Sequence, residues 1–231
     1  MIDQFEIFKK TIRKLKTKMS KIFAQIDQKK FGNKEFVIIS NNCWGGQIYL
    51  RLNKPYNTPF IGLFIFGPDY IRLLQRFDYY LSCPLTFISQ SSWSDAKILY
   101  PIGCLEDIEI HFVHYKNKEE AFDKWTRRLI RLNSVKDRNN FFFKIDDRDL
   151  TTSEIIKDFH SLPFVNKISF GIKEISIKEH IVMIEKNQES VPDGVILYKK
   201  GFRYVDQLKW IKTGFITNNL YSKIKNFAGI E

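Results

Sequence analysis

Residues 36–53 read FVIISNNCWGGQIYLRLN, and this stretch contains the pattern from which the fold follows. The apolar run at 36–40 is typical of a buried strand, and the spacing of apolar residues at 47–52 is typical of a helix. The intervening SNNCWGG predicts one of three features: a loop that holds a ligand, a loop that presents a nucleophile, or a tight turn with Trp44 packed beneath it.

The same alternation continues along the chain. Because strands that alternate with helices need crossover connections, it indicates a mostly parallel or mixed sheet with helices on both faces. After residue 172 we expect strands in EHIVMIEKN and GVILYKKG and a closing helix at 204–213. The predicted fold is a three-layer α/β/α domain at 33–231, preceded by a basic amphipathic helix at 1–32. Further strands are predicted at 60–66, 85–90, 107–114, 140–145 and 167–172, and further helices at 68–81, 118–133 and 151–162, where TTSE resembles a capping box.

The composition is that of a globular protein of a reducing compartment. Hydrophobic residues make up 44% of the 231 positions and charged residues 27%, which excludes a disordered chain. The three cysteines form no CxxC pair, which argues against a disulfide framework or a zinc knuckle. We see no signal peptide, and the longest apolar run, at 60–67, is far shorter than the roughly 20 residues of a membrane-spanning helix. We expect a cytoplasmic protein, with peripheral contact to the inner face of the membrane as an alternative.

The N-terminal helix concentrates the positive charge. Residues 1–30 include nine basic and three acidic side chains and so carry +6 of the formal net charge of +11. Such a helix suits an anionic membrane surface, a second copy of the chain in a homo-oligomer, or docking on its own domain. Nucleic acid is disfavoured because no aromatic platform alternates with the lysines. The apolar side chains repeat at steps of three and four: Phe5, Phe8, Ile12, Leu15, Met19, Ile22 and Ile26.

Polar groups follow most of the predicted strands. In an open parallel sheet, ligands bind beyond the carboxyl ends of the strands, so SNNCWGG, GPD, SQSSW, His114 and DDRD would share one rim. Glycines near a helix start admit anions, amides bind sugar hydroxyls or base edges, and arginines bind phosphate. In the helix at 118–133, Glu120 and Asp123 can instead pair with Lys124 and Arg127 at i,i+4 spacing, which would give a solvated, self-neutralised face. The expected ligand-binding residues are Ser40, Asn41, Asn42, Trp44, Gly45, Gly46, Arg127, Arg128, Arg131 and Arg148.

Three residues are candidates for catalysis. Cys43 lies at a helix start, where the dipole favours a thiolate, and His114 is its candidate base. Asp147 is either a base or, with Asp149, a ligand of a divalent cation such as Mg²⁺ or Mn²⁺ that bridges a pyrophosphate. Each has a simpler interpretation, in which the histidine is packed and the aspartates form a surface turn.

Four separated segments of the chain carry a resemblance. They are ISNNCWGGQIY, YNTPFIGLFIFGPDYIRLL, HFVHYKNKEEAFDKWTRRLIRLN and FHSLPFVNKISF. Together they resemble a bacterial family linked to exopolysaccharide biosynthesis, which is known mainly as a domain of unknown function. The resemblance runs from about residue 36 to about residue 213 and excludes the basic helix. It implies a three-layer α/β domain and a role in making surface polysaccharide, and it implies no particular reaction.

Three functional hypotheses follow. The first is a glycosyltransferase-like protein of surface polysaccharide synthesis that binds a sugar nucleotide or a lipid-linked sugar phosphate. The second is a hydrolase or acyltransferase in which Cys43 is the nucleophile and His114 the base. The third is a non-catalytic binding subunit of a polysaccharide assembly complex.

Overall fold

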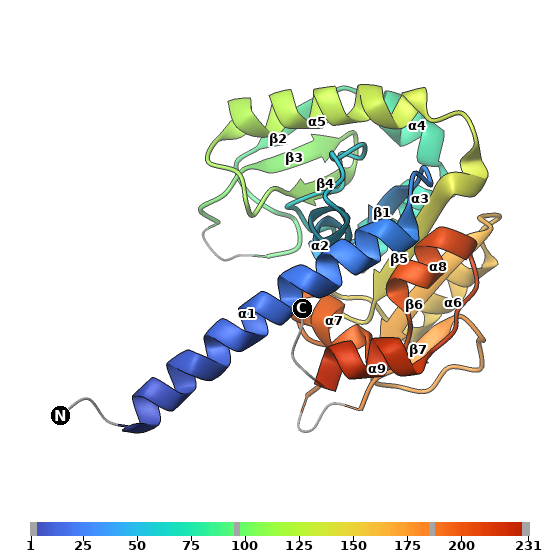
Figure 1. Ribbon diagram of the computed structural model, residues 1–231. Coiled ribbons are helices and arrows are strands. Elements are labelled where there is room, and N and C mark those ends of the chain that lie inside the picture. The colour runs from blue at the N-terminus through green and yellow to red at the C-terminus, as the bar shows by residue number, and fades with distance from the viewer. Residues whose placement is uncertain (1–3, 95–97, 185–187, 228–231) are drawn as a thin grey trace.

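A four-stranded parallel sheet forms the centre of the protein (Figure 1). The computed structural model describes residues 4–94, 98–184 and 188–227. Neighbouring strands of the sheet, in the order β1-β5-β6-β7, are all parallel. The strands predicted at 36–40, 140–145 and 167–172 are therefore confirmed, and EHIVMIEKN supplies the last short strand. The bounds are Val37–Ser40 (β1), Phe141–Asp146 (β5), Asn166–Gly171 (β6) and His180–Val182 (β7).

Both faces of this sheet are buried, which confirms the α/β class. Ile39 of β1 and Phe143 of β5 belong to one hydrophobic core, whereas Ile38 and Phe142 belong to the other, because successive strand residues point to opposite faces. The first core is covered by α3 (Gly67–Gln75), α4 (Phe77–Ser82), α5 (Lys118–Ser134) and α6 (Ser153–Ser161). The second is covered by α1 (Gln4–Phe31), α2 (Trp44–Leu52), α7 (Gly194–Gly201) and α8 (Gln207–Thr213).

Some helices differ from the sequence prediction in ways that local chemistry explains. The helix predicted at 68–81 is two helices, because Arg76 leaves the helical region with φ −128° and ψ 45°. GVILYKKG is the helix α7 and not a strand, since the Asp193 carboxylate accepts hydrogen bonds from the N–H groups of Val195 and Ile196 in its first turn. The cap of α6 is Thr152, one residue after the predicted capping threonine.

A second, antiparallel sheet in the order β2-β3-β4 packs beside the first core. It contains the strands predicted at 85–90 and 107–114, which are therefore absent from the parallel sheet, and a strand that the sequence did not predict. The strand predicted at 60–66 is wrong, since within the described residues this segment makes only an isolated bridge between Phe64 and His111. The bounds are Leu85–Ile88 (β2), Ile102–Leu105 (β3) and Ile108–His111 (β4).

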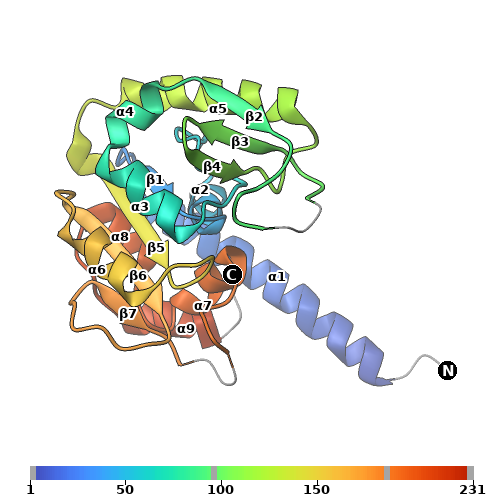
Figure 2. The ribbon, with the colours of Figure 1, turned by 180° about the vertical axis from the view of Figure 1, so that it is seen from behind.

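The N-terminal helix is packed at one end only. Figures 1 and 2 both show its C-terminal end against the domain and its N-terminal end projecting away from it. Asp27 is buried and fixes the packed end, because its carboxylate accepts hydrogen bonds from Arg51 at 2.7 Å, Lys225 at 3.1 Å and Tyr221 at 3.0 Å. Tyr221 and Lys225 belong to the last helix, α9 (Leu220–Phe227). Within the described residues no helix is both long enough and apolar enough to cross a membrane.

Candidate functional site

A buried polar network lies where β1 and β5 end. The Lys144 ammonium donates hydrogen bonds to the side-chain oxygens of Asn41 at 3.1 Å and Asn42 at 3.0 Å, and it also bonds to the Asp146 carboxylate. Both asparagines donate in turn to Asp146, at 3.2 and 2.6 Å. Lys144, Asp146 and Asn41 are fully buried. These four side chains mainly satisfy one another and fix the carboxyl edge of the sheet.

The two charges of this network stabilise each other. Burial alone would raise the pKa of Asp146, but the attraction and hydrogen bond of Lys144 together with the two asparagine amides lower it. Burial lowers the pKa of Lys144, which Asp146 partly offsets. The structure therefore gives Asn41 and Asn42 a structural role, and the prediction that they bind ligand finds no support in their geometry.

Other residues of the SNNCWGG turn also serve packing. Ser40 and Trp44 are fully buried, and the Trp44 ring packs 6.2 Å from Phe170 in the second core. A Cβ atom at Gly45 would lie 2.8 Å from the Ile38 side chain, so this glycine permits α2 to approach β1. Of the two glycines predicted to admit an anion, Gly45 therefore serves the packing of α2 on β1.

The two aspartates after β5 that were predicted as metal ligands have different surroundings. The Asp147 carboxylate accepts hydrogen bonds from the backbone N–H groups of Ile172 and Val191, both at 2.8 Å. It therefore connects the end of β6 to the loop before α7. In the described part of the chain, no three His, Cys, Asp or Glu residues converge as a set of metal ligands. The Asp149 carboxyl has a different environment from that of Asp147: burial and then Asp146 raise its pKa to about 6. Its φ of 53° and the φ of 63° at Leu150 place two successive residues in the left-handed region.

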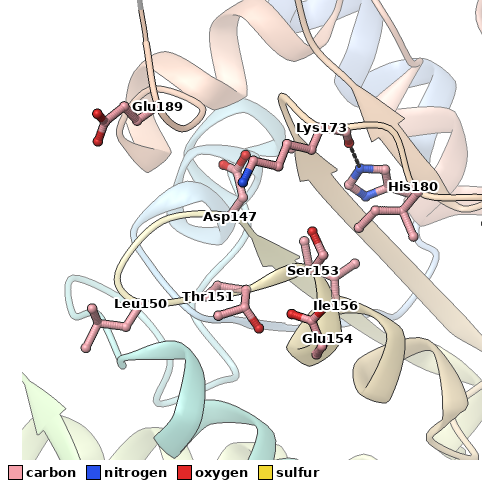
Figure 3. A pocket seen from close by; sticks show the side chains of 12 residues that line it. Asp147, Leu150, Thr151, Ser153, Glu154, Ile156, Lys173, His180 and Glu189 are labelled. Carbon is pink, nitrogen blue, oxygen red and sulfur yellow. Dashed lines mark hydrogen bonds between the residues drawn. The ribbon is translucent and has the colours of Figure 1, made fainter.

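A large pocket, which we call the α6 pocket, lies beside the carboxyl ends of β5 and β6 and the first residue of β7, His180 (Figure 3). Its volume is about 610 Å³. Among the described residues that line it, Asp147, Glu154 and Glu189 contribute carboxylates, whereas Lys173 is the one cation. The hydroxyl-bearing residues at the start of α6 complete the polar surface. This balance of charge is unfavourable for a phosphate and suits neutral hydroxyl groups.

A chain of hydrogen bonds runs behind the α6 pocket. His160 Nε2 lies 2.7 Å from Ser169 Oγ, which lies 2.8 Å from His180 Nδ1, and His180 Nε2 lies 3.0 Å from the Lys173 carbonyl. Because the carbonyl only accepts, His180 carries its proton on Nε2, the serine donates to its Nδ1, and His160 donates to the serine. Burial, and then Lys167, lower the pKa of His160 to about 4. The His160 imidazole is thus held neutral in this chain of hydrogen bonds.

A second pocket, the cationic pocket, gathers several of the residues that the sequence predicted. It has a volume of about 250 Å³ and lies between α2, the 53–66 loop, the residues after β4, and α5. Two of its lining residues are cations, and none of them, within the described chain, carries a carboxylate. The lining comprises Cys43, Gly46, Gln47, Leu50, Tyr56, Ile61, Gly62, His114, Tyr115, Lys124, Arg128 and Val195.

Arg128 is held in this pocket by two tyrosines. Its Nη1 donates to the Tyr115 hydroxyl at 2.6 Å, and its guanidinium carbon lies 4.9 Å from the centre of the Tyr56 ring. The Tyr115 hydroxyl itself donates to the Ile61 carbonyl at 2.5 Å. A guanidinium has five N–H donors, so most of the donors of Arg128 are left for a ligand. Lys124 also lines the pocket, but its ammonium is paired with the Glu120 carboxylate at 2.6 Å, so Arg128 is the main source of positive charge there.

Cys43 and His114 both line the cationic pocket, as the cysteine hypothesis requires. However, burial raises the pKa of the Cys43 thiol to about 11, with only partial compensation from Lys144. The thiol donates to the Leu63 carbonyl at 3.7 Å. Because the thiolate is the nucleophile, this environment is the opposite of an activating one.

The remaining predicted arginines lie elsewhere. Arg127 is exposed and pairs with Asp123 at 3.0 Å, which confirms the self-neutralised face that the i,i+4 spacing predicted. Arg131 donates to the Tyr56 carbonyl at 2.9 Å and so supports the wall of the cationic pocket. Arg148 donates to the Val191 carbonyl at 3.2 Å and is half-buried beside the network of β1 and β5.

Comparison with known proteins places the chain in a family. The model of the domain of unknown function DUF1919 matches residues 13–213. The chain belongs to the DUF1919 family. An uncharacterized protein of Haemophilus influenzae (strain ATCC 51907 / DSM 11121 / KW20 / Rd) is 35% identical over 188 residues, which cover 80% of this chain and 86% of the relative. The DUF1919 match begins within α1, so the expectation that this helix lies outside the family is wrong from residue 13 onward.

Sequence reasoning missed two features of this DUF1919 protein. The first is the buried pair of Lys144 and Asp146 inside an apolar strand. Their spacing of two residues, which places both on the same face of β5, could have indicated the pair. Tyr56 and Tyr115 shape the cationic pocket, and no local pattern marks them, since they meet only when the 53–66 loop folds against α5.

Proposed function

We propose that this DUF1919 protein binds a phosphate-bearing monosaccharide in the cationic pocket and acts in the synthesis of bacterial surface polysaccharide. The observation that carries the proposal is the position of Arg128, held between Tyr115 and Tyr56 with Lys124 beside it. None of the described residues that line the pocket carries a carboxylate. A planar guanidinium binds phosphate oxygens in pairs, and tyrosine rings pack on the apolar faces of sugars.

The size of the pocket selects the ligand. A volume of about 250 Å³ lies just below the range of roughly 300–1,000 Å³ that is typical of pockets for drug-sized ligands. A monosaccharide phosphate therefore fits within it, whereas the base and ribose of a nucleotide-sugar would extend over the surface outside. The α6 pocket is larger, but its three carboxylates disfavour a phosphate there.

The residues of the cationic pocket have distinct roles in this proposal. Arg128 and Lys124 neutralise the phosphate, and Gln47 offers an amide to the sugar hydroxyls. His114 is exposed at the edge of the pocket and is the candidate base for transfer of the sugar or a related group. The link to surface polysaccharide rests on the sequence resemblance to an exopolysaccharide-associated family. A binding subunit without catalysis would use the same pocket and omit the step at His114.

The cysteine mechanism is the weaker alternative. A thiol whose pKa is raised to about 11 has very little thiolate at neutral pH, and its hydrogen bond to the Leu63 carbonyl stabilises the protonated form. The shared pocket of Cys43 and His114 is the one feature that favours it.

Titration calorimetry tests the proposal. Hexose 1-phosphates and nucleotide-sugars are titrated into the protein with and without Mg²⁺, and the free hexose and inorganic phosphate serve as comparison ligands. We expect the hexose 1-phosphate to bind more tightly than the free hexose. Loss of charge-assisted hydrogen bonds in Arg128→Gln should weaken binding roughly tenfold to a hundredfold.

Arg127→Gln is the matched control, because this residue lies on the same helix and pairs with Asp123 outside the pocket. It should leave the affinity unchanged. Since Arg128 also bonds to Tyr115, Lys124→Gln provides a second test, and thermal unfolding checks that each variant is folded. Equal losses in Arg127→Gln and Arg128→Gln, or no binding of any phosphate-bearing sugar, would remove the proposal.

A further inference from the structure

The projecting end of α1 exposes large apolar side chains to solvent. Phe8 is 61% exposed, Leu15 58% and Ile12 38%. These three residues share one side of the helix, because they are separated by four and three positions. Figures 1 and 2 show this end of α1 extending away from the other described elements. The exposure of the three side chains shows that the described chain leaves the stripe largely uncovered.

Basic side chains surround this stripe. Six of them lie between residues 6 and 18, where Glu6 is the only acidic residue and pairs with Lys9 at 3.0 Å. Lys16 and Lys18 flank the apolar side on its two edges, from which long lysine stems reach past an apolar surface. The six are Lys9, Lys10, Arg13, Lys14, Lys16 and Lys18, and a shallow groove along the same helix is lined by Lys10, Arg13, Lys14, Thr17, Lys18 and Lys21.

The rest of α1 behaves differently. From Ser20 onward the helix contacts α2 and α9, since Ser20 accepts a hydrogen bond from Arg51 and Phe23 packs 5.6 Å from the Tyr221 ring. The buried ion pairs of Asp27 then fix the helix to the domain. Docking on the protein's own domain therefore explains part of the second half of the apolar stripe, in which Ile22 remains 47% exposed, and leaves the first half uncovered within the described chain.

Charge distinguishes the remaining candidates for a partner that covers the exposed stripe of α1. A second copy of this helix would bring two strongly positive segments together, and each holds one acidic residue that is already paired. Nucleic acid would neutralise the basic residues but leave Phe8, Ile12 and Leu15 in water. An anionic lipid surface satisfies both features, because the headgroups attract the basic residues while the acyl boundary takes up the apolar ones.

We propose that the projecting segment of α1, residues 6–18, is an anchor that lies in the surface of an anionic membrane. The packed end of the same helix then joins the anchor to the domain without a linker. This inference does not depend on the ligand of the cationic pocket, and either proposal can fail alone.

Vesicle co-sedimentation of the full chain provides the test. The vesicles contain either phosphatidylcholine alone or phosphatidylcholine mixed with about one-third phosphatidylglycerol, which supplies the negative surface. We expect binding to the mixed vesicles that weakens as the ionic strength rises toward about 1 M, where the screening length is about 3 Å. Replacing Lys9, Lys10, Arg13 and Lys14 with Gln should lower the partition coefficient roughly a thousandfold at low salt.

A matched variant removes the same charge from the surface of the domain, at Lys118, Arg127, Lys136 and Lys157, all of which are exposed. It should bind the mixed vesicles nearly as well as the wild type. The substitution Phe8→Ser/Leu15→Ser should weaken binding without lowering the unfolding temperature, because both residues are exposed.

Three results would overturn the proposal. The first is equal binding to neutral and mixed vesicles, or binding to neither. The second is a stable dimer in sedimentation equilibrium that Leu15→Ser separates, which would assign the stripe to a second copy. The third is binding to duplex DNA that exceeds vesicle binding at the same salt and that Phe8→Ser/Leu15→Ser leaves unchanged.

Discussion

Replacing Lys144 with Met tests the network at the carboxyl ends of β1 and β5. Lys144 is fully buried and donates to three acceptors, so its loss leaves the Asp146 carboxylate buried with only neutral donors. Removing one partner of a buried ion pair costs about 3–5 kcal/mol. For a chain of this size, the unfolding temperature should fall by roughly 6–20 °C. Thermal and urea unfolding at pH 8 measure both quantities.

The stability deficit of Lys144→Met, which is its loss of unfolding free energy relative to the wild type, should also depend on pH. Lys144 is the main attraction that lowers the pKa of Asp146, and without it burial would raise this pKa above its usual value. The folded variant then binds a proton more readily than its unfolded chain, so its deficit is full at pH 8 and shrinks as the pH falls toward about 4. Lys144→Met/Asp146→Asn should recover part of the loss, and Lys157→Met, which is exposed on α6, should cost little. A deficit below about 1 kcal/mol at pH 8, or one that does not change with pH, would refute the role assigned to this pair.

Three further predictions concern other parts of the structure. Because the pKa of His160 is lowered to about 4, its neutral form contributes stability above the unfolded pKa of about 6.5, and this stability should be lost progressively between pH 6.5 and pH 4. The free energy of unfolding, measured with urea across this range, should depend less steeply on pH in His160→Gln than in the wild type. With a thiol pKa of about 11, Cys43 should react with iodoacetamide far more slowly at pH 7.5 than a free cysteine does, and a fast reaction there would restore the cysteine mechanism. Gly45→Ala should destabilise the protein by about 1–3 kcal/mol, because the added Cβ would lie 2.8 Å from Ile38, whereas Gly46→Ala, whose nearest neighbour is 3.7 Å away, should be tolerated.

The parallel sheet was predictable from the sequence, whereas the second sheet was not. The runs that became β1, β5 and β6 are buried on both faces and bounded by turns, which is the pattern of a parallel strand. The run at 60–66 is equally apolar, and Phe60, Leu63 and Ile65 are fully buried, yet its backbone is irregular. Apolar composition indicates burial there, and it does not fix the hydrogen-bond pattern.

The candidate site was predictable only in part, because its residues meet through distant contacts. Cys43, Gly46, His114 and Arg128 were all singled out from local patterns, and the fold brings them to one pocket. The asparagines after β1 looked available for a ligand because their partner, Lys144, lies about a hundred positions away along the chain. A buried charge must be hydrogen-bonded, so it takes nearby side-chain amides as partners even where the local sequence predicts that they bind a ligand.

A structure of the protein with a hexose 1-phosphate bound tests the central claim most directly. The account predicts that the phosphate lies in the cationic pocket, with oxygens about 2.7–3.2 Å from the guanidinium of Arg128 and with the sugar against Tyr56. A phosphate bound instead in the α6 pocket or along the lysines of α1, or a cationic pocket that stays empty when the ligand is saturating, would contradict it.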